Sequence, residues 1–122
     1  MSSIRATTIS DLAGTGPATL TGQYAAKAWV NFNGTGTVAI GASGNVTSIT
    51  DNGTGLYTVN FTTALADTNF AINATARNPF NSSAGEMIGL TGSGITTSTV
   101  QVRNATTGAS YDTNPVCVSV HR

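Results

Sequence analysis

The clearest alternation of apolar and polar residues lies in the segment 56–62, LYTVNFT. Tyr57, Val59 and Phe61 fall on one face of an extended strand, and the residues between them fall on the other. We predict that the face with the aromatic rings is buried. Asn52-Gly53 precedes this strand and supplies the positive φ angles of a tight hairpin turn, so we predict a hairpin with residues 46–50.

The register of this hairpin depends on the length of its loop. A two-residue turn at Asn52-Gly53 sets Val46 opposite Val59 and Ile49 opposite Leu56. A three-residue loop at residues 52–54 sets Ile49 opposite Tyr57 instead. The extra Gly55 permits a bulge, so the sequence leaves both registers open.

The same alternation predicts further strands, which we place at residues 26–33, 37–42, 69–77, 87–90, 97–104 and 116–121. Helical periodicity is absent from the sequence. The expected inward faces carry Ala28, Val30 and Phe32 in the first of these strands, Phe70, Ile72, Ala74 and Ala76 in the third, Val100 and Val102 in the fifth, and the valines of the last. Seven or eight short strands at these intervals predict an all-β, antiparallel β-sandwich.

Trp29 lies on the face of the first strand opposite its inward residues. A side chain of that size on the outer face suggests contact with another surface, so we name Trp29 as a candidate for a subunit interface. Residues 1–23 contain no aromatic residue, and we predict an extended N-terminal arm that attaches to a larger assembly or wraps a neighbouring subunit. Residues 24–122 form the predicted sandwich domain.

Composition changes the picture in three ways. Charged residues make up 8% of the chain and the net charge is zero, so we expect no nucleic-acid partner and no attraction to an anionic membrane. Cys117 is the single cysteine, which rules out an internal disulfide, and we expect it to be a buried strand residue. The sequence shows neither a signal peptide nor an apolar run that could span a membrane, so we expect no membrane insertion.

Candidate chemistry is sparse. The five carboxylates are Asp11, Asp51, Asp67, Glu86 and Asp112; Asp51 suits a turn, and only Glu86 and Asp112 could meet as a glycosidase pair. His121 is the single histidine and has no Cys or His at metal-ligand spacing. We therefore predict no catalytic residues, no metal site and no cofactor.

Two long loops offer binding groups, because each combines an aromatic ring with amides that suit the hydroxyls of a sugar. The alternative is that Phe80 and Tyr111 simply anchor these loops to the core. The candidate receptor or glycan contacts are Asn78, Phe80, Asn81, Tyr111, Asp112 and Asn114.

The segments AKAWVNFNGTGTVAI and NVTSITDNGTGLYTVNFTTAL resemble a module at the C-terminal ends of tail fibres and related virion surface proteins of bacteriophages, especially phages of marine and freshwater bacteria. The resemblance covers about two-thirds of the chain, from Ala26 onward. It implies a jelly-roll type of sandwich, a homotrimer, a location on the exterior surface of the virion, and a non-enzymatic role in contacting a host cell-surface glycan or protein. The arm would then bind other virion proteins.

The chain has almost no shaft before this module, which favours a second hypothesis. On that hypothesis the protein is a small capsid decoration (cement) protein that clamps the shell through its N-terminal arm.

Overall fold

The computed structural model describes residues 24–77, 85–90, 94–106 and 109–122, which form nine β-strands and no helix. In the described part of the chain, nothing has the length and hydropathy of a membrane-spanning helix. The predicted arm, residues 1–23, and three of the candidate contacts, Asn78, Phe80 and Asn81, lie outside the described residues. The strands are β1 (Ala26–Asn33), β2 (Ala39–Gly44), β3 (Val46–Gly53), β4 (Leu56–Phe61), β5 (Ala71–Arg77), β6 (Gly85–Leu90), β7 (Thr99–Thr106), β8 (Ala109–Ser110) and β9 (Val116–His121).

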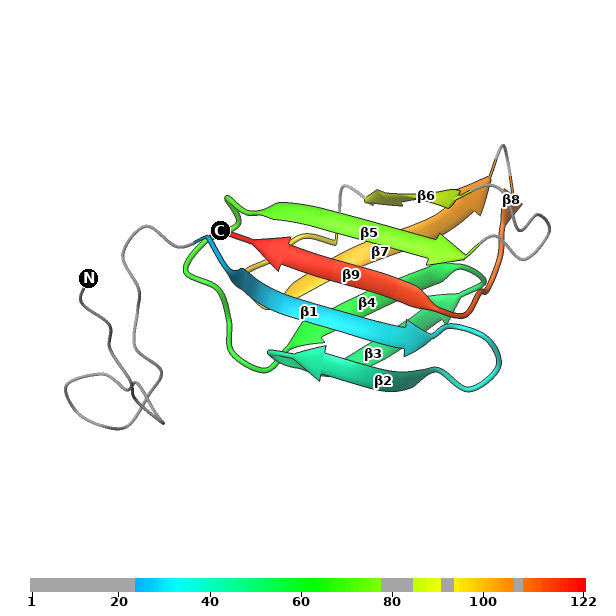
Figure 1. Cartoon of the computed structure of the whole chain (residues 1–122), viewed down its shortest axis with the longest axis horizontal. Helices are drawn as coiled ribbons and strands as arrows, with labels where there is room; N and C mark the ends of the chain where they lie inside the picture. The colour runs from blue at the N-terminus through cyan, green and yellow to red at the C-terminus, as the bar shows by residue number, and fades with distance from the viewer. Residues whose placement is uncertain (1–23, 78–84, 91–93, 107–108) are drawn as a thin grey trace, which may run out of the picture.

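The strands form two antiparallel layers, as predicted. One layer runs β2-β1-β9-β5 and the other β3-β4-β7, and β6 pairs with both β5 and β7 along one side (Figure 1). The first strand pairs with the last, β1 with β9, and β4 pairs with β7 inside that outer pair. This nested pairing of a double-layered sheet is typical of a jelly roll. The chain is therefore an all-β, jelly-roll-like sandwich.

The core lies between the two layers and consists of the faces that alternation predicts. Ala28, Val30 and Phe32 from β1 are buried, and so are the inward residues of β4, β7 and β9. The residues predicted to face inward from the 69–77 segment, Phe70, Ile72, Ala74 and Ala76, are partly buried and pack against this core. The Phe32 ring meets the Tyr57 ring edge to face, with centroids 5.1 Å apart and an interplanar angle of 75°. Because these rings come from opposite layers, their contact ties the two sheets together.

The β3–β4 hairpin has neither of the two predicted registers. Val46 pairs with Phe61, Ile49 with Val59, and Gly53 with Leu56. The turn residues are therefore Thr54 and Gly55, and Asn52-Gly53 forms part of an irregularity in the ladder that lies before the turn. Strand β3 is longer than predicted for this reason.

The chain passes from one layer to the other at Asn45, the single residue between β2 and β3. Asn45 has a positive φ of 55°, a conformation that asparagine tolerates better than most residues. Its side-chain amide donates to the carbonyl oxygens of Lys27 and Thr63 at 3.0 and 3.1 Å, and its Oδ1 accepts from the Thr63 backbone N–H at 2.8 Å. One side chain thus holds β1, the β2–β3 corner and the end of β4 together.

Cys117 does not lie in the core, contrary to our expectation. In β9 the valines at 116, 118 and 120 point inward, so the alternation turns Cys117 to the outer face, where it is half-buried. The apolar character of the residue misled the prediction, whereas its position between two inward valines gave the correct face.

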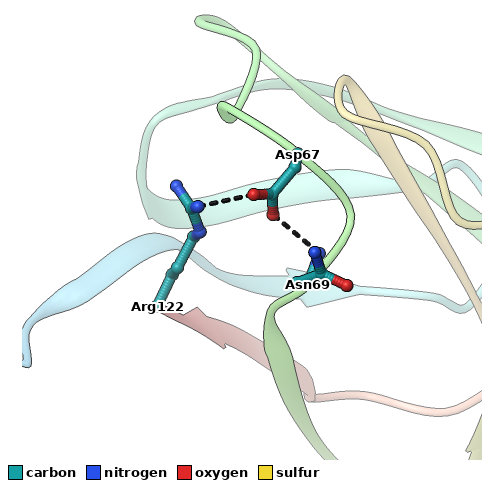
Figure 2. A network of polar contacts seen from close by, with 3 residues as sticks. All are labelled: Asp67, Asn69 and Arg122. Carbon is teal, nitrogen blue, oxygen red and sulfur yellow. Dashed lines mark hydrogen bonds and ion pairs between the residues drawn. The ribbon is translucent and has the colours of Figure 1, made fainter.

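The last residue of the chain is tied to the connection between β4 and β5. Arg122 forms an ion pair with Asp67 at 2.5 Å, and Asp67 also accepts the Asn69 backbone N–H at 2.8 Å (Figure 2). Both partners of the ion pair are about 40% exposed, so we assign it little stability.

Candidate functional site

The outer face of the β2-β1-β9-β5 layer carries a shallow hollow of about 420 Å³. Its side chains come from three neighbouring strands whose outward positions line up across the ladder. Trp29 pairs with Ser119, which pairs with Asn73, and Asn31 pairs with Cys117, which pairs with Thr75. These two rows of three form what we call the outer-face hollow: Trp29, Ser119, Asn73, Asn31, Cys117 and Thr75.

The Trp29 indole has a defined packing position on this face. Its cross-strand partner in β2 is Gly44. A Cβ atom at Gly44 would lie 2.3 Å from the indole Nε1 and 2.8 Å from Cδ1, so the pyrrole edge of the ring occupies the space that any other residue would fill. The indole remains 43% exposed. The glycine therefore fixes the ring on the rim of the hollow without covering it.

Three polar side chains of the hollow make no hydrogen bond to another residue in the described ranges: Asn31, Asn73 and Thr75. Several asparagines elsewhere form hydrogen bonds within the protein. Asn60, for example, donates to Thr50 Oγ1 at 3.0 Å, and Asn45 holds the β2–β3 corner. The amides of the hollow are thus available to a ligand. Ser119 Oγ lies 3.1 Å from His121 Nε2 and keeps further hydrogen-bonding capacity.

The end of the sandwich near the β3–β4 turn contains a buried polar cluster. The Tyr57 hydroxyl lies 2.9 Å from the Gly34 carbonyl oxygen and 2.9 Å from Asp112 Oδ1, which also accepts the Gly55 backbone N–H at 2.7 Å. Burial raises the pKa of Tyr57 above its usual value, and the hydrogen bond to Asp112 and the negative charges of Asp112 and Asp51 raise it further. Asp112 therefore joins the loops at this end.

The structure places the candidate contacts of the second loop in different environments. Tyr111 is only 8% exposed and packs inside, which leaves little of its ring for a sugar to stack upon. This is the anchoring alternative that the sequence left open. Asp112 serves the buried cluster, and Asn114 is exposed on the rim of a smaller hollow of about 290 Å³ that also includes Arg77 and Thr113. Ligand contact here stays a prediction, for which Asn114 is the best placed.

The two predicted loops leave the domain at the same end. Arg77 is the last described residue before Asn78, and its carbonyl oxygen accepts a hydrogen bond from Thr113 Oγ1 at 2.5 Å. Its backbone N–H donates to the Pro115 carbonyl oxygen at 3.2 Å. The start of one loop is thus bonded directly to the other.

Two other carboxylates, Asp51 and Asp67, have partners within the protein. Asp51 accepts the Gly53 backbone N–H at 2.9 Å, as its turn position predicted, and Asp67 pairs with Arg122. No cluster of three or more metal-binding side chains occurs among the residues that the structure describes. The arrangement of the outer-face hollow suits reversible binding of a ligand.

Sequence reasoning identified one member of the hollow, Trp29, and assigned it to a subunit interface. It missed the polar members, Asn31, Asn73, Thr75 and Ser119, although Asn73 and Thr75 alternate with the predicted inward residues of their strand and so were expected on its outer face. The missing information was the order of strands, which brings β1, β9 and β5 side by side.

Comparison of the chain with protein-family models, with curated proteins and with solved structures finds no match.

Proposed function

We propose that this chain is a non-enzymatic structural module of a bacteriophage virion, located on the exterior surface and of the tail-fibre or receptor-binding type. In this role the domain presents a binding surface to a host cell-surface molecule. Residues 1–23 attach it to other virion proteins, and copies of the chain associate as a homotrimer.

One observation supports the proposal most directly: the stretch that resembles phage fibre modules forms a structural unit that exposes its tryptophan. Residues 26–61 form the four consecutive strands β1 to β4, with β1 and β2 in one layer and β3 and β4 in the other. Trp29, within the first of the two resembling segments, points away from the core and borders a hollow. A surface indole beside free amides is typical of recognition.

The low charge of the chain, in which charged residues make up 8%, supports an assembled role. The described residues form a single ion pair, between Arg122 and Asp67. Tyr24 is 88% exposed and Ile40 is also exposed, so both offer apolar surface that a neighbouring copy could cover. We place the homotrimer contact at such positions, which leaves the outer-face hollow open.

The decisive experiment locates the protein in virions. Gold-labelled antibody against the purified chain should mark the tail tip or fibre in electron micrographs, and excess free protein should reduce adsorption of the phage to its host. Labelling distributed over the capsid shell would overturn the receptor-binding role in favour of the decoration protein. Turnover of host glycan by the purified protein would refute the non-enzymatic part.

A further inference from the structure

We propose that the outer-face hollow is a binding site for a neutral hexose ring of a glycan, with Trp29 as the stacking platform. The inference rests on the proposed receptor-binding function and names the ligand class. It places the site on the face of the sheet, away from the two loops that the sequence favoured.

The ligand must match a surface with one aromatic ring and several small polar groups. The exposed indole of Trp29 offers an apolar, electron-rich face to the C–H groups of a sugar ring. The amides of Asn31 and Asn73 can each donate and accept hydrogen bonds, and the Thr75 and Ser119 hydroxyls can do the same. A hexose presents one apolar face and a rim of hydroxyls, so it satisfies both kinds of group together.

The absence of charged residues in the hollow should distinguish neutral from acidic sugars. None of the residues lining it is charged. An acidic sugar would lose part of its hydration on entering without gaining a cationic partner among the residues of the hollow, and desolvation of an unpaired charge is costly. The site should therefore prefer neutral hexoses to sugars that carry a carboxylate.

The site is also preorganised. Its polar groups stand on three paired strands, and the absence of a side chain at Gly44 leaves space for the indole, so binding requires little ordering of the backbone. A volume of about 420 Å³ falls within the usual range for small-molecule sites.

The hollow contains two built-in reporters. Trp29 is the only tryptophan and Cys117 is the only cysteine of the chain, and both line it. A bound sugar should change the emission of Trp29 and slow the alkylation of Cys117 by iodoacetamide. Because both signals come from one site, their half-maximal sugar concentrations should agree.

The experiment titrates the full chain with neutral oligosaccharides of glucose, galactose, mannose and N-acetylglucosamine, and with one uronic-acid oligosaccharide for comparison. Cys117 protection then measures the affinity of the variants. Trp29→Ala should weaken binding roughly tenfold or more. Asn73→Ala, at an exposed position where folding is safe, should weaken it roughly threefold to tenfold. The matched control Asn69→Ala, exposed but outside both hollows, should stay within about twofold. Asn114→Ala, at the rim of the smaller hollow, tests the loop end as the alternative position of the sugar.

Four results would overturn the inference. The first is no response to any neutral sugar at about 10 mM. The second is a loss of binding in Asn114→Ala but not in Asn73→Ala, which would place the sugar at the loop end. The third is tighter binding of the acidic oligosaccharide. The fourth is slow alkylation of Cys117 in the absence of sugar, together with an oligomer that Trp29→Ala dissociates and whose loss restores fast alkylation. That result would show that the hollow is a contact between copies of the chain. If the protein is found elsewhere than at the proposed place in the virion, its binding of sugar can still be measured. The two proposals can therefore be refuted separately.

Discussion

Replacing Tyr57 by phenylalanine tests whether the buried hydroxyl cluster holds the loop end of the sandwich together. Tyr57 is fully buried, and its ring would keep the contact with Phe32 in the variant. The substitution removes only the hydroxyl that reaches Asp112 and the Gly34 carbonyl oxygen. Asp112 would keep the hydrogen bond from the Gly55 backbone N–H but lose the partner on its side facing the core.

The magnitude follows from the charge of the acceptor. The hydroxyl has one proton, so it donates to one of its two neighbours at a time, and the carboxylate is the stronger acceptor. A hydrogen bond to a charged group contributes roughly 1.5–3 kcal/mol, and an unsatisfied buried partner adds to the loss. For a domain of this size we expect Tyr57→Phe to lower the melting temperature by about 6–12 °C.

The assays are thermal unfolding for the melting temperature and urea unfolding for the free energy, both followed by far-ultraviolet circular dichroism. Tyr24→Phe is the matched control, because Tyr24 is 88% exposed, and its free energy of unfolding should change by less than about 0.5 kcal/mol. Combining Tyr57→Phe with Asp112→Asn, which keeps an acceptor for Gly55, should give a coupling energy of roughly 0.5–3 kcal/mol. A cost for Tyr57→Phe no larger than that of the control, or strictly additive effects with Asp112→Asn, would refute the reasoning.

The remaining predictions concern pH, the β2–β3 corner and the seat of the indole. Because the pKa of Tyr57 is raised in the folded state, its contribution to stability is complete below the unfolded value of 10.0 and is lost as the pH rises above it. The difference in unfolding free energy between wild type and Tyr57→Phe should therefore shrink above pH 10.0, and a constant difference would contradict the assignment. Asn45→Ala should cost roughly 2–4 kcal/mol in urea unfolding, since it removes three hydrogen bonds and strains a residue at positive φ. Asn45→Gly should lower the free energy of unfolding by less than Asn45→Ala does. Equal losses for the two variants would show that backbone strain at this position does not contribute. Gly44→Ala should shift the emission of Trp29, whereas Gly41→Ala, whose Cβ would make ordinary contacts, should not; the same spectrum for both variants would show that the indole is not seated there.

The faces of the strands could be predicted because alternation is a local property. A residue two places along a strand points the same way whatever the rest of the fold does, so Tyr57, Val59 and Phe61 are buried as expected. The register of the hairpin, in contrast, is not determined by nearby residues alone. Asn52-Gly53 and Thr54-Gly55 can both form a tight turn, and the neighbouring residues do not decide between them.

Contacts from distant strands decide the register. A Cβ atom at Gly55 would lie 2.6 Å from the Asn104 carbonyl oxygen and 2.8 Å from that of Tyr111, so only glycine fits there. The Gly55 backbone N–H also donates to Asp112. These partners lie about fifty residues further along the chain, and the turn is fixed at Thr54-Gly55 by their presence.

The outer-face hollow could not be predicted from the sequence for a related reason. We looked for binding groups that are neighbours in the sequence, as Tyr111, Asp112 and Asn114 are, and the fold buries Tyr111 and uses Asp112 to join loops. A binding site on the face of a sheet draws instead on residues that are neighbours across the ladder. Trp29 and Ser119 become adjacent only because the first strand pairs with the last, and alternation within each strand contains no information about that pairing. For a sandwich of this kind, the outward residues of each strand are therefore the set to search, and the strand order selects which of them can act together.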